Sequence, residues 1–122
     1  MIIKSIRFEN YRAYYGEVLF DFPIDGEKNI SILFANNDVG KSCFFAGVLF
    51  CMYGPKENLK DLINVNAFNE KVYQSSVTMF VEHNDESIEI TRTIQLRGKI
   101  QGVPASKDFE STLTVISNGK PI

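Results

Sequence analysis

One stretch organises the architecture of this chain: Asn29-Ile30-Ser31-Ile32-Leu33-Phe34-Ala35-Asn36-Asn37-Asp38-Val39-Gly40-Lys41-Ser42. An apolar, strand-like run leads into a short polar turn that ends in Gly-Lys-Ser. An almost uncharged segment, residues 41–53, follows the turn and predicts a helix. A strand, a glycine-containing turn and a helix in this order are the arrangement of a phosphate-binding loop, or P-loop.

The residue types of the turn suit a polyphosphate. Successive backbone N–H groups and the positive end of the following helix form a cradle for an anion. Gly40 lets the backbone approach the phosphates closely because it has no Cβ. Lys41 is expected to reach the β- and γ-phosphates, and the Ser42 hydroxyl to bind Mg²⁺. The motif is G-x-x-x-x-G-K-[ST] with Ala35 in place of the first glycine. We expect the Asp38 carboxylate to point away from the phosphates, because like charges about 4 Å apart repel by about 1 kcal/mol even in water.

Length and composition describe an ordinary globular unit. The 122 residues are 44% hydrophobic and 23% charged, which predicts one folded domain or a part of one. A net charge of −2 gives no general basic surface for nucleic acid.

Cys43 and Cys51 would lie about 12 Å apart on one helix, so they cannot pair with each other, and with a single histidine they predict no metal site. The sequence has no signal-peptide pattern and no apolar run of about 18 residues, so we expect a cytoplasmic protein with no membrane partner.

The spacing of apolar residues predicts the other elements. Strands are expected over residues 1–10, 17–22 and 29–34. The helix over residues 41–53 is apolar on all sides, should be buried on most faces and is stopped by Gly54-Pro55. A short helix is expected over residues 56–63 and a loop over residues 64–69.

From residue 73 the apolar period changes to two. This predicts an antiparallel hairpin with one polar face and a turn at Asn84-Asp85-Glu86, then a third strand over residues 109–116 and a turn over residues 118–121. We therefore expect an α/β fold with a P-loop core, about residues 1–63, and an antiparallel β-subdomain, about residues 70–117.

With these residues in view, the chain resembles the N-terminal lobe of SMC/RecF-type ABC ATPase heads, such as those of double-strand-break-repair and DndD-like defence proteins. The resemblance rests on residues 3–8 leading into Glu9-Asn10-Tyr11-Arg12, on Tyr15-Gly16, on Phe20-Asp21-Phe22, on the P-loop and on the helix end Met52-Tyr53-Gly54. It covers residues 1–55 in detail and the hairpin region only as a pattern. The loop departs from the family's common G-x-N-G-x-G-K pattern at Ala35 and Asp38.

The resemblance implies a P-loop NTPase whose mixed sheet surrounds the P-loop helix, with ATP and Mg²⁺ as cofactors. It places Asn36, Asn37, Gly40, Lys41, Ser42 and Cys43 along the phosphates, with Ser42 on the metal. Arg12 would reach the nucleotide from the first connection, although a solvated surface arginine is an equal alternative. The family's Q-loop glutamine, signature motif and Walker B acidic pair are not recognisable here, so no catalytic residue is identified.

The resemblance also implies partners and a biological role. This chain would be one lobe of an incomplete ATPase head, completed by the C-terminal lobe of the same head and by a second head in an ATP-dependent dimer. DNA and a nuclease or effector subunit are the further partners that it implies. The role would be DNA repair, chromosome organisation or anti-phage defence, and the chain alone is expected to be inactive as an ATP hydrolase.

Two other functions stay open. In a self-contained P-loop kinase or GTPase, Thr78-Met79-Phe80-Val81-Glu82 would act as a Walker B strand, although its alternation and the turn that follows favour a hairpin. A non-catalytic nucleotide-sensing or interaction module would assemble with its partners without Lys41. Four basic residues are candidates for an edge near DNA, against the plainer interpretation of scattered surface charges: Arg92, Arg97, Lys99 and Lys107.

Overall fold

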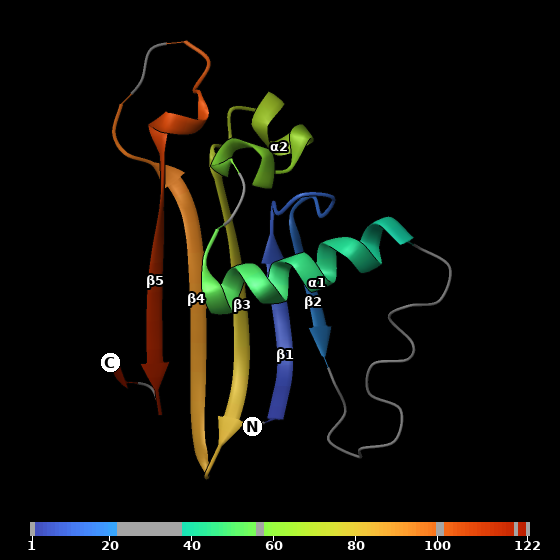
Figure 1. Cartoon of the computed structure of the whole chain (residues 1–122), viewed down its shortest axis with the longest axis vertical. Coiled ribbons are helices and arrows are strands. Elements are labelled where there is room, and N and C mark those ends of the chain that lie inside the picture. The colour runs from blue at the N-terminus through green and yellow to red at the C-terminus, as the bar shows by residue number, and fades with distance from the viewer. Residues whose placement is uncertain (1, 22–37, 56–57, 100–101, 119, 122) are drawn as a thin grey trace.

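The computed structural model describes residues 2–21, 38–55, 58–99, 102–118 and 120–121 (Figure 1). Within these residues six strands form one sheet in the order β2-β1-β3-β4-β5-β6, and every pairing is antiparallel. The strands are β1 (Ile2–Glu9), β2 (Glu17–Asp21), β3 (Gln74–His83), β4 (Glu86–Leu96), β5 (Phe109–Ser117) and β6 (Lys120–Pro121). The helices are α1 (Asp38–Tyr53) and α2 (Val65–Asn69), with 3-10 turns η2 (Leu59–Leu62) and η3 (Ser106–Asp108). The strand predicted over residues 29–34, which would make the sheet mixed, lies outside the described residues.

The strands follow the sequence pattern closely. β1 to β5 occupy the predicted segments, and β1 pairs directly with β3, so the N-terminal strands and the hairpin share one sheet. The hairpin turn lies at Asn84 and Asp85, which both have positive φ angles of 51° and 65°. Asparagine and aspartate tolerate this conformation, and two such residues match the twist of the flanking strands. The prediction for the last residues was wrong in part, because Lys120–Pro121 pairs with β5 as a short strand instead of remaining in a turn.

The helical segments differ more from the prediction. α1 begins at Asp38, three residues before the predicted start, and ends at Tyr53 as predicted. Its end is marked by Gly54, whose φ of 92° only glycine adopts easily and whose N–H donates to the Phe50 carbonyl. A short helix was predicted over residues 56–63, and the structure has the 3-10 turn η2 (Leu59–Leu62) within this range. The loop predicted over residues 64–69 was wrong: α2 forms there, because the Asn64 side chain caps its first N–H groups.

The core lies between α1 and one face of the sheet. Figure 1 shows α1 crossing the strands on that face, and the side chains buried between them come from both layers. They include Ile6, Phe8, Phe44, Phe50, Cys51, Val77, Met79, Val81 and Ile94. On the opposite face of the hairpin the hydroxyls of Thr78 and Thr91 lie 3.1 Å apart, which agrees with the predicted polar face.

The prediction that α1 is buried on most faces was wrong. In the described part of the chain the sheet covers one side of the helix. On its other side Phe45, Leu49, Met52 and Tyr53 are 50%, 57%, 37% and 68% exposed. The spacing of these four residues places them on one stripe of the helix surface, which we call the outer stripe.

Helix α1 and strand β1 approach each other closely at Gly47. A Cβ atom built on this glycine would lie 2.2 Å from Cε1 of Phe8, far inside the normal contact distance. The Phe8 ring has no room to yield, because it is fully buried and packs against the rings of Tyr11, Tyr14 and Phe20. Gly47 therefore sets the distance between α1 and β1.

We expect Gly47→Ala to lower the free energy of unfolding by up to about 2 kcal/mol. Overpacking a filled core costs about 1–3 kcal/mol, which outweighs the gain of about 1 kcal/mol that alanine brings to a helix interior. Urea denaturation followed by circular dichroism measures the change. The matched control is the same substitution in a Phe8→Leu background, where the clashing ring atom is gone. There Gly47→Ala should be neutral or stabilising, and an equal loss in both backgrounds would contradict the proposed contact.

Candidate functional site

The N-terminal end of α1 carries the last residues of the predicted P-loop. Because the helix begins at Asp38, Gly40 and Lys41 lie in its first turn and Ser42 follows directly. The first four N–H groups of an α-helix have no acceptor within the helix, and the helix dipole is positive at this end. A helix of 16 residues thus presents free amide donors where the sequence predicts a phosphate site. A helix start of this kind is a common binding site for a phosphate group.

Three further residues were predicted to contact the phosphates. Asn36 and Asn37 lie outside the described residues, and for Cys43 the structure describes only the backbone, which is part of α1. Their predicted roles, and those of the Lys41 and Ser42 side chains, stay predictions. Among the described residues no group of three histidine, cysteine, aspartate or glutamate side chains could hold a metal ion.

The connection from β1 to β2, residues 10–16, carries the other predicted nucleotide contact, Arg12. Asn10 and Arg12 both have left-handed backbones, with φ angles of 50° and 49°. The connection closes on itself, because the Asn10 and Gly16 backbones are joined by a hydrogen bond of 2.9 Å and the Asn10 side chain accepts from the Gly16 N–H. Arg12 is partly buried. The structure thus gives Arg12 a defined backbone position, a feature that the sequence pattern did not indicate.

Asn64 joins this connection to the segment between η2 and α2. Its side-chain N–H₂ donates to the Arg12 carbonyl at 2.8 Å, and its backbone N–H donates to the Asn10 carbonyl at 2.8 Å. Its side-chain oxygen accepts from the N–H groups of Asn66 and Ala67 at the start of α2. Asn64 is only 5% exposed. Asn64 was predicted to lie in a loop, although asparagine before a short apolar segment is a helix N-cap signal.

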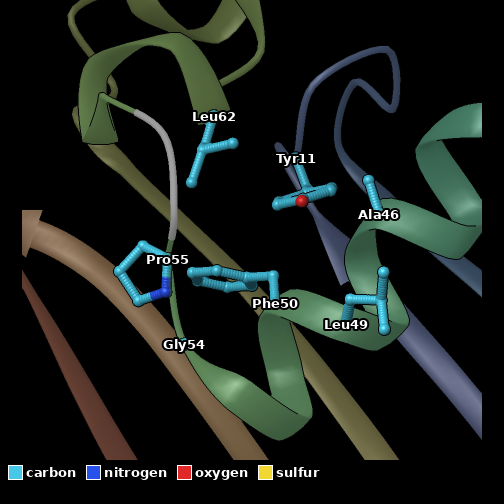
Figure 2. Close-up of a pocket in the computed structure, with 7 residues that line it drawn as sticks. All are labelled: Tyr11, Ala46, Leu49, Phe50, Gly54, Pro55 and Leu62. Atoms are coloured by element: carbon cyan, nitrogen blue, oxygen red, sulfur yellow. The ribbon is translucent and has the colours of Figure 1, made fainter.

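A pocket of about 140 Å³ lies beside the second half of α1 (Figure 2). It is lined by Tyr11, Ala46, Leu49, Phe50, Gly54, Pro55 and Leu62. Its lining carries no charged side chain, and it lies away from the helix start where the phosphate chemistry is expected. The pocket shares Leu49 with the outer stripe, so it belongs to the apolar outer surface of α1.

Arg92 and Arg97, two of the four candidates for a basic edge, have structural contacts. The Arg92 Nε donates to the Cys51 carbonyl at 3.3 Å, near the C-terminal end of α1, where the helix dipole favours a cation. The Arg97 Nε donates to the Phe109 carbonyl at 3.0 Å. Each bond uses one of the five N–H groups of the guanidinium, and Arg97, Lys99 and Lys107 are all exposed. The basic edge near DNA stays a prediction.

The segment that imitates a Walker B strand has the wrong surroundings for one. It lies in β3, which is antiparallel to both of its neighbours, β1 and β4. Glu82 forms an ion pair of 2.7 Å with Lys4, and both side chains are more than a third exposed. A Walker B strand is a buried central strand of a parallel sheet. The structure favours the predicted hairpin over this alternative.

Cys51 is not a reactive group. Its thiol is fully buried and lies 3.5 Å and 3.4 Å from the carbonyl oxygens of Val77 and Ile90. Burial raises the pKa of the Cys51 thiol to about 11, so the group stays protonated at neutral pH. Cys51 therefore acts as a small apolar residue of the core. In the part of the chain that the structure describes, no helix has both the length and the apolar character needed to cross a bilayer.

The comparisons with known proteins agree with the P-loop assignment. A family model described as an AAA domain matches residues 5–119, nearly the whole chain. AAA domains are ATP-binding P-loop NTPase domains, and this one is found in SMC/RecF-like proteins. A search of curated proteins gives no match. Residues 5–119 hold the Gly-Lys-Ser turn, α1 and strands β3 to β5 together, so the chain belongs to the AAA-domain family of P-loop NTPases.

Proposed function

We propose that this chain binds Mg·ATP as half of an SMC-like ATPase site. The observation that carries the proposal is the position of the Gly-Lys-Ser sequence, whose residues are the third to fifth residues of a 16-residue helix. Helix N–H groups and the Lys41 ammonium bind the phosphates, and the Ser42 hydroxyl binds Mg²⁺. Bound Mg²⁺ would neutralise charge on the phosphates during hydrolysis. Arg12 contacts the nucleotide from the connection between β1 and β2.

A second lobe completes the site in this proposal, because the described residues supply no catalytic acid. The outer stripe supports a protein partner on α1: four large apolar side chains in one row are 37–68% exposed, and the apolar pocket adjoins them. Contiguous exposed apolar surface of this kind marks docking sites. The partner that we propose for it is the C-terminal lobe of the same ATPase head.

The more distant partners and the pathway come from the resemblance to SMC/RecF-type heads. We propose a second head joined through ATP, with DNA and a nuclease or effector subunit as further partners. DNA repair, chromosome organisation and anti-phage defence all fit this scheme. ATP would stabilise the joined state by binding it more tightly than the separated heads, and hydrolysis would release it.

We expect the purified chain to bind Mg·ATP without hydrolysing it. Isothermal titration calorimetry measures the binding, and phosphate release above a protein-free control measures turnover. Heat of association that disappears when ATP is replaced by adenosine would support a phosphate-directed site. No association with either ATP or GTP would overturn the proposal.

Turnover by the chain alone would instead favour the self-contained kinase or GTPase. Glu82→Gln should then abolish that turnover, whereas in our proposal it only removes the exposed ion pair with Lys4. The non-catalytic module predicts that Lys41→Ala leaves partner assembly unchanged, whereas the ATP-dependent scheme predicts its loss.

A further inference from the structure

We propose that Asn64 is a positioning residue for the nucleotide site, because it holds the backbone of the connection that carries Arg12. The inference rests on the proposed function, in which Arg12 contacts the nucleotide. It adds a residue that does not itself touch the ligand and that lies 22 positions after Ser42 in the chain.

The first step of the argument is the backbone conformation of Arg12. A left-handed conformation in a residue other than glycine costs roughly 1 kcal/mol, so surrounding contacts must hold it. Two hydrogen bonds do so directly: the Arg12 N–H donates to the Leu62 carbonyl at 2.9 Å, and the Arg12 carbonyl accepts from Asn64 at 2.8 Å. Both partners belong to one short segment, residues 62–64.

The second step is the way in which Asn64 itself is held. Its side-chain amide is used at both ends, since the oxygen caps α2 while the nitrogen donates to Arg12. An amide is the group that does this best, because it combines an acceptor and two donors on a rigid plane. With its backbone N–H on the Asn10 carbonyl, Asn64 contacts the connection on both sides of Tyr11. Its near-complete burial keeps water from replacing these bonds.

A third contact lies at the far end of the connection. The Tyr15 hydroxyl donates to the Glu70 carboxylate, which follows the last residue of α2. This hydrogen bond is the main reason that the pKa of Tyr15 lies above its ordinary value. Residues 10–16 and residues 62–70 are thus joined at both ends, and Figure 1 shows α2 and this connection at the same end of the sheet. A change at Asn64 therefore alters the position from which Arg12 acts.

The substitution Asn64→Asp keeps the cap on α2 but removes the hydrogen bond to the Arg12 carbonyl. Aspartate caps α2 as well as asparagine does, but it has no N–H to donate and turns an acceptor toward the Arg12 carbonyl. We expect Arg12→Ala to weaken Mg·ATP binding by about tenfold or more, the range for a lost hydrogen bond to a charged group. Asn64→Asp should weaken binding by about three- to tenfold, the range for a lost neutral hydrogen bond, because it displaces Arg12 without removing it. The double variant should bind no more weakly than Arg12→Ala alone, because the two residues act through one contact.

NMR titration of the full chain with Mg·ATP measures these affinities, and amide hydrogen exchange in the same samples reports whether the Arg12 N–H loses protection. Asn66→Asp is the matched control, because it adds the same charge at an exposed position in the first turn of α2. Its affinity should equal that of the wild type. If Asn64→Asp does not fold, Asn64→Ser keeps the cap with a side chain too short to reach Arg12, and the same losses are expected.

The outcomes separate this inference from the proposed function. The inference would be overturned if a folded Asn64 variant had normal Mg·ATP affinity and normal exchange protection of the Arg12 N–H. It would also be overturned if Arg12→Ala left the affinity unchanged. In either case, weaker Mg·ATP binding by Lys41→Ala would still support the P-loop site. Additive losses from Asn64→Asp and Arg12→Ala would also overturn it. If the wild type does not bind Mg·ATP at all, the proposed function itself fails.

Discussion

Lys41→Ala is expected to weaken Mg·ATP binding by about one to two orders of magnitude. A charge-assisted hydrogen bond from an ammonium group to a phosphate contributes roughly 1.5–3 kcal/mol, and each 1.4 kcal/mol corresponds to about a tenfold change in affinity. Lys41 belongs to the first turn of α1, where the free amide donors would remain after the substitution. Calorimetric titration with Mg·ATP measures the loss, and residual weak binding is expected from the amides alone.

Two controls make the Lys41 result specific. Lys99→Ala removes the same charge from an exposed position and should leave the affinity unchanged apart from a small, salt-dependent effect. Lys41→Arg keeps the charge but replaces a compact ammonium with a larger planar group, so binding should recover only in part. Unchanged affinity in a folded Lys41→Ala variant would contradict the P-loop assignment of this turn.

Phe8→Ala is expected to lower the free energy of unfolding by about 3–5 kcal/mol, the usual range for a buried phenylalanine. Phe8 is fully buried in β1, and its ring centre lies 4.7 Å from that of Tyr14 and 6.0 Å from that of Phe44 on α1. Aromatic pairs of this geometry contribute about 0.5–1.5 kcal/mol beyond their buried area. The loss is a large part of the stability of a small domain, so the variant should be partly unfolded at room temperature.

Urea denaturation followed by far-ultraviolet circular dichroism measures this effect, since the chain has no tryptophan to report by fluorescence. Leu19→Ala is the matched control, because Leu19 lies on the neighbouring strand β2 but is 51% exposed. It should change the stability by less than about 1 kcal/mol. A loss below about 1 kcal/mol for Phe8→Ala would show that α1 does not pack on β1 as described.

The elements with a strong local pattern were predictable. The alternation in β3 and β4 and the Asn84-Asp85 turn between them specified a hairpin, because side chains alternate across a strand and few residues accept two positive φ angles. Gly54 and Pro55 specified the end of α1 for a similarly local reason. The α2 helix was missed because five residues carry too little periodicity to compete with a loop assignment, and its cap acts through a single side chain.

The sequence by itself predicted a P-loop NTPase, because the spacing of glycine, lysine and serine is a local requirement of polyphosphate chemistry. It also predicted the segments that form strands β1 to β5. Only the tertiary structure decided that one face of an apolar helix is exposed, that Arg92 binds a helix end, and that Asn64 holds the connection carrying Arg12. These contacts join residues about 40 to 52 positions apart, and no local pattern encodes which distant segment a side chain will meet.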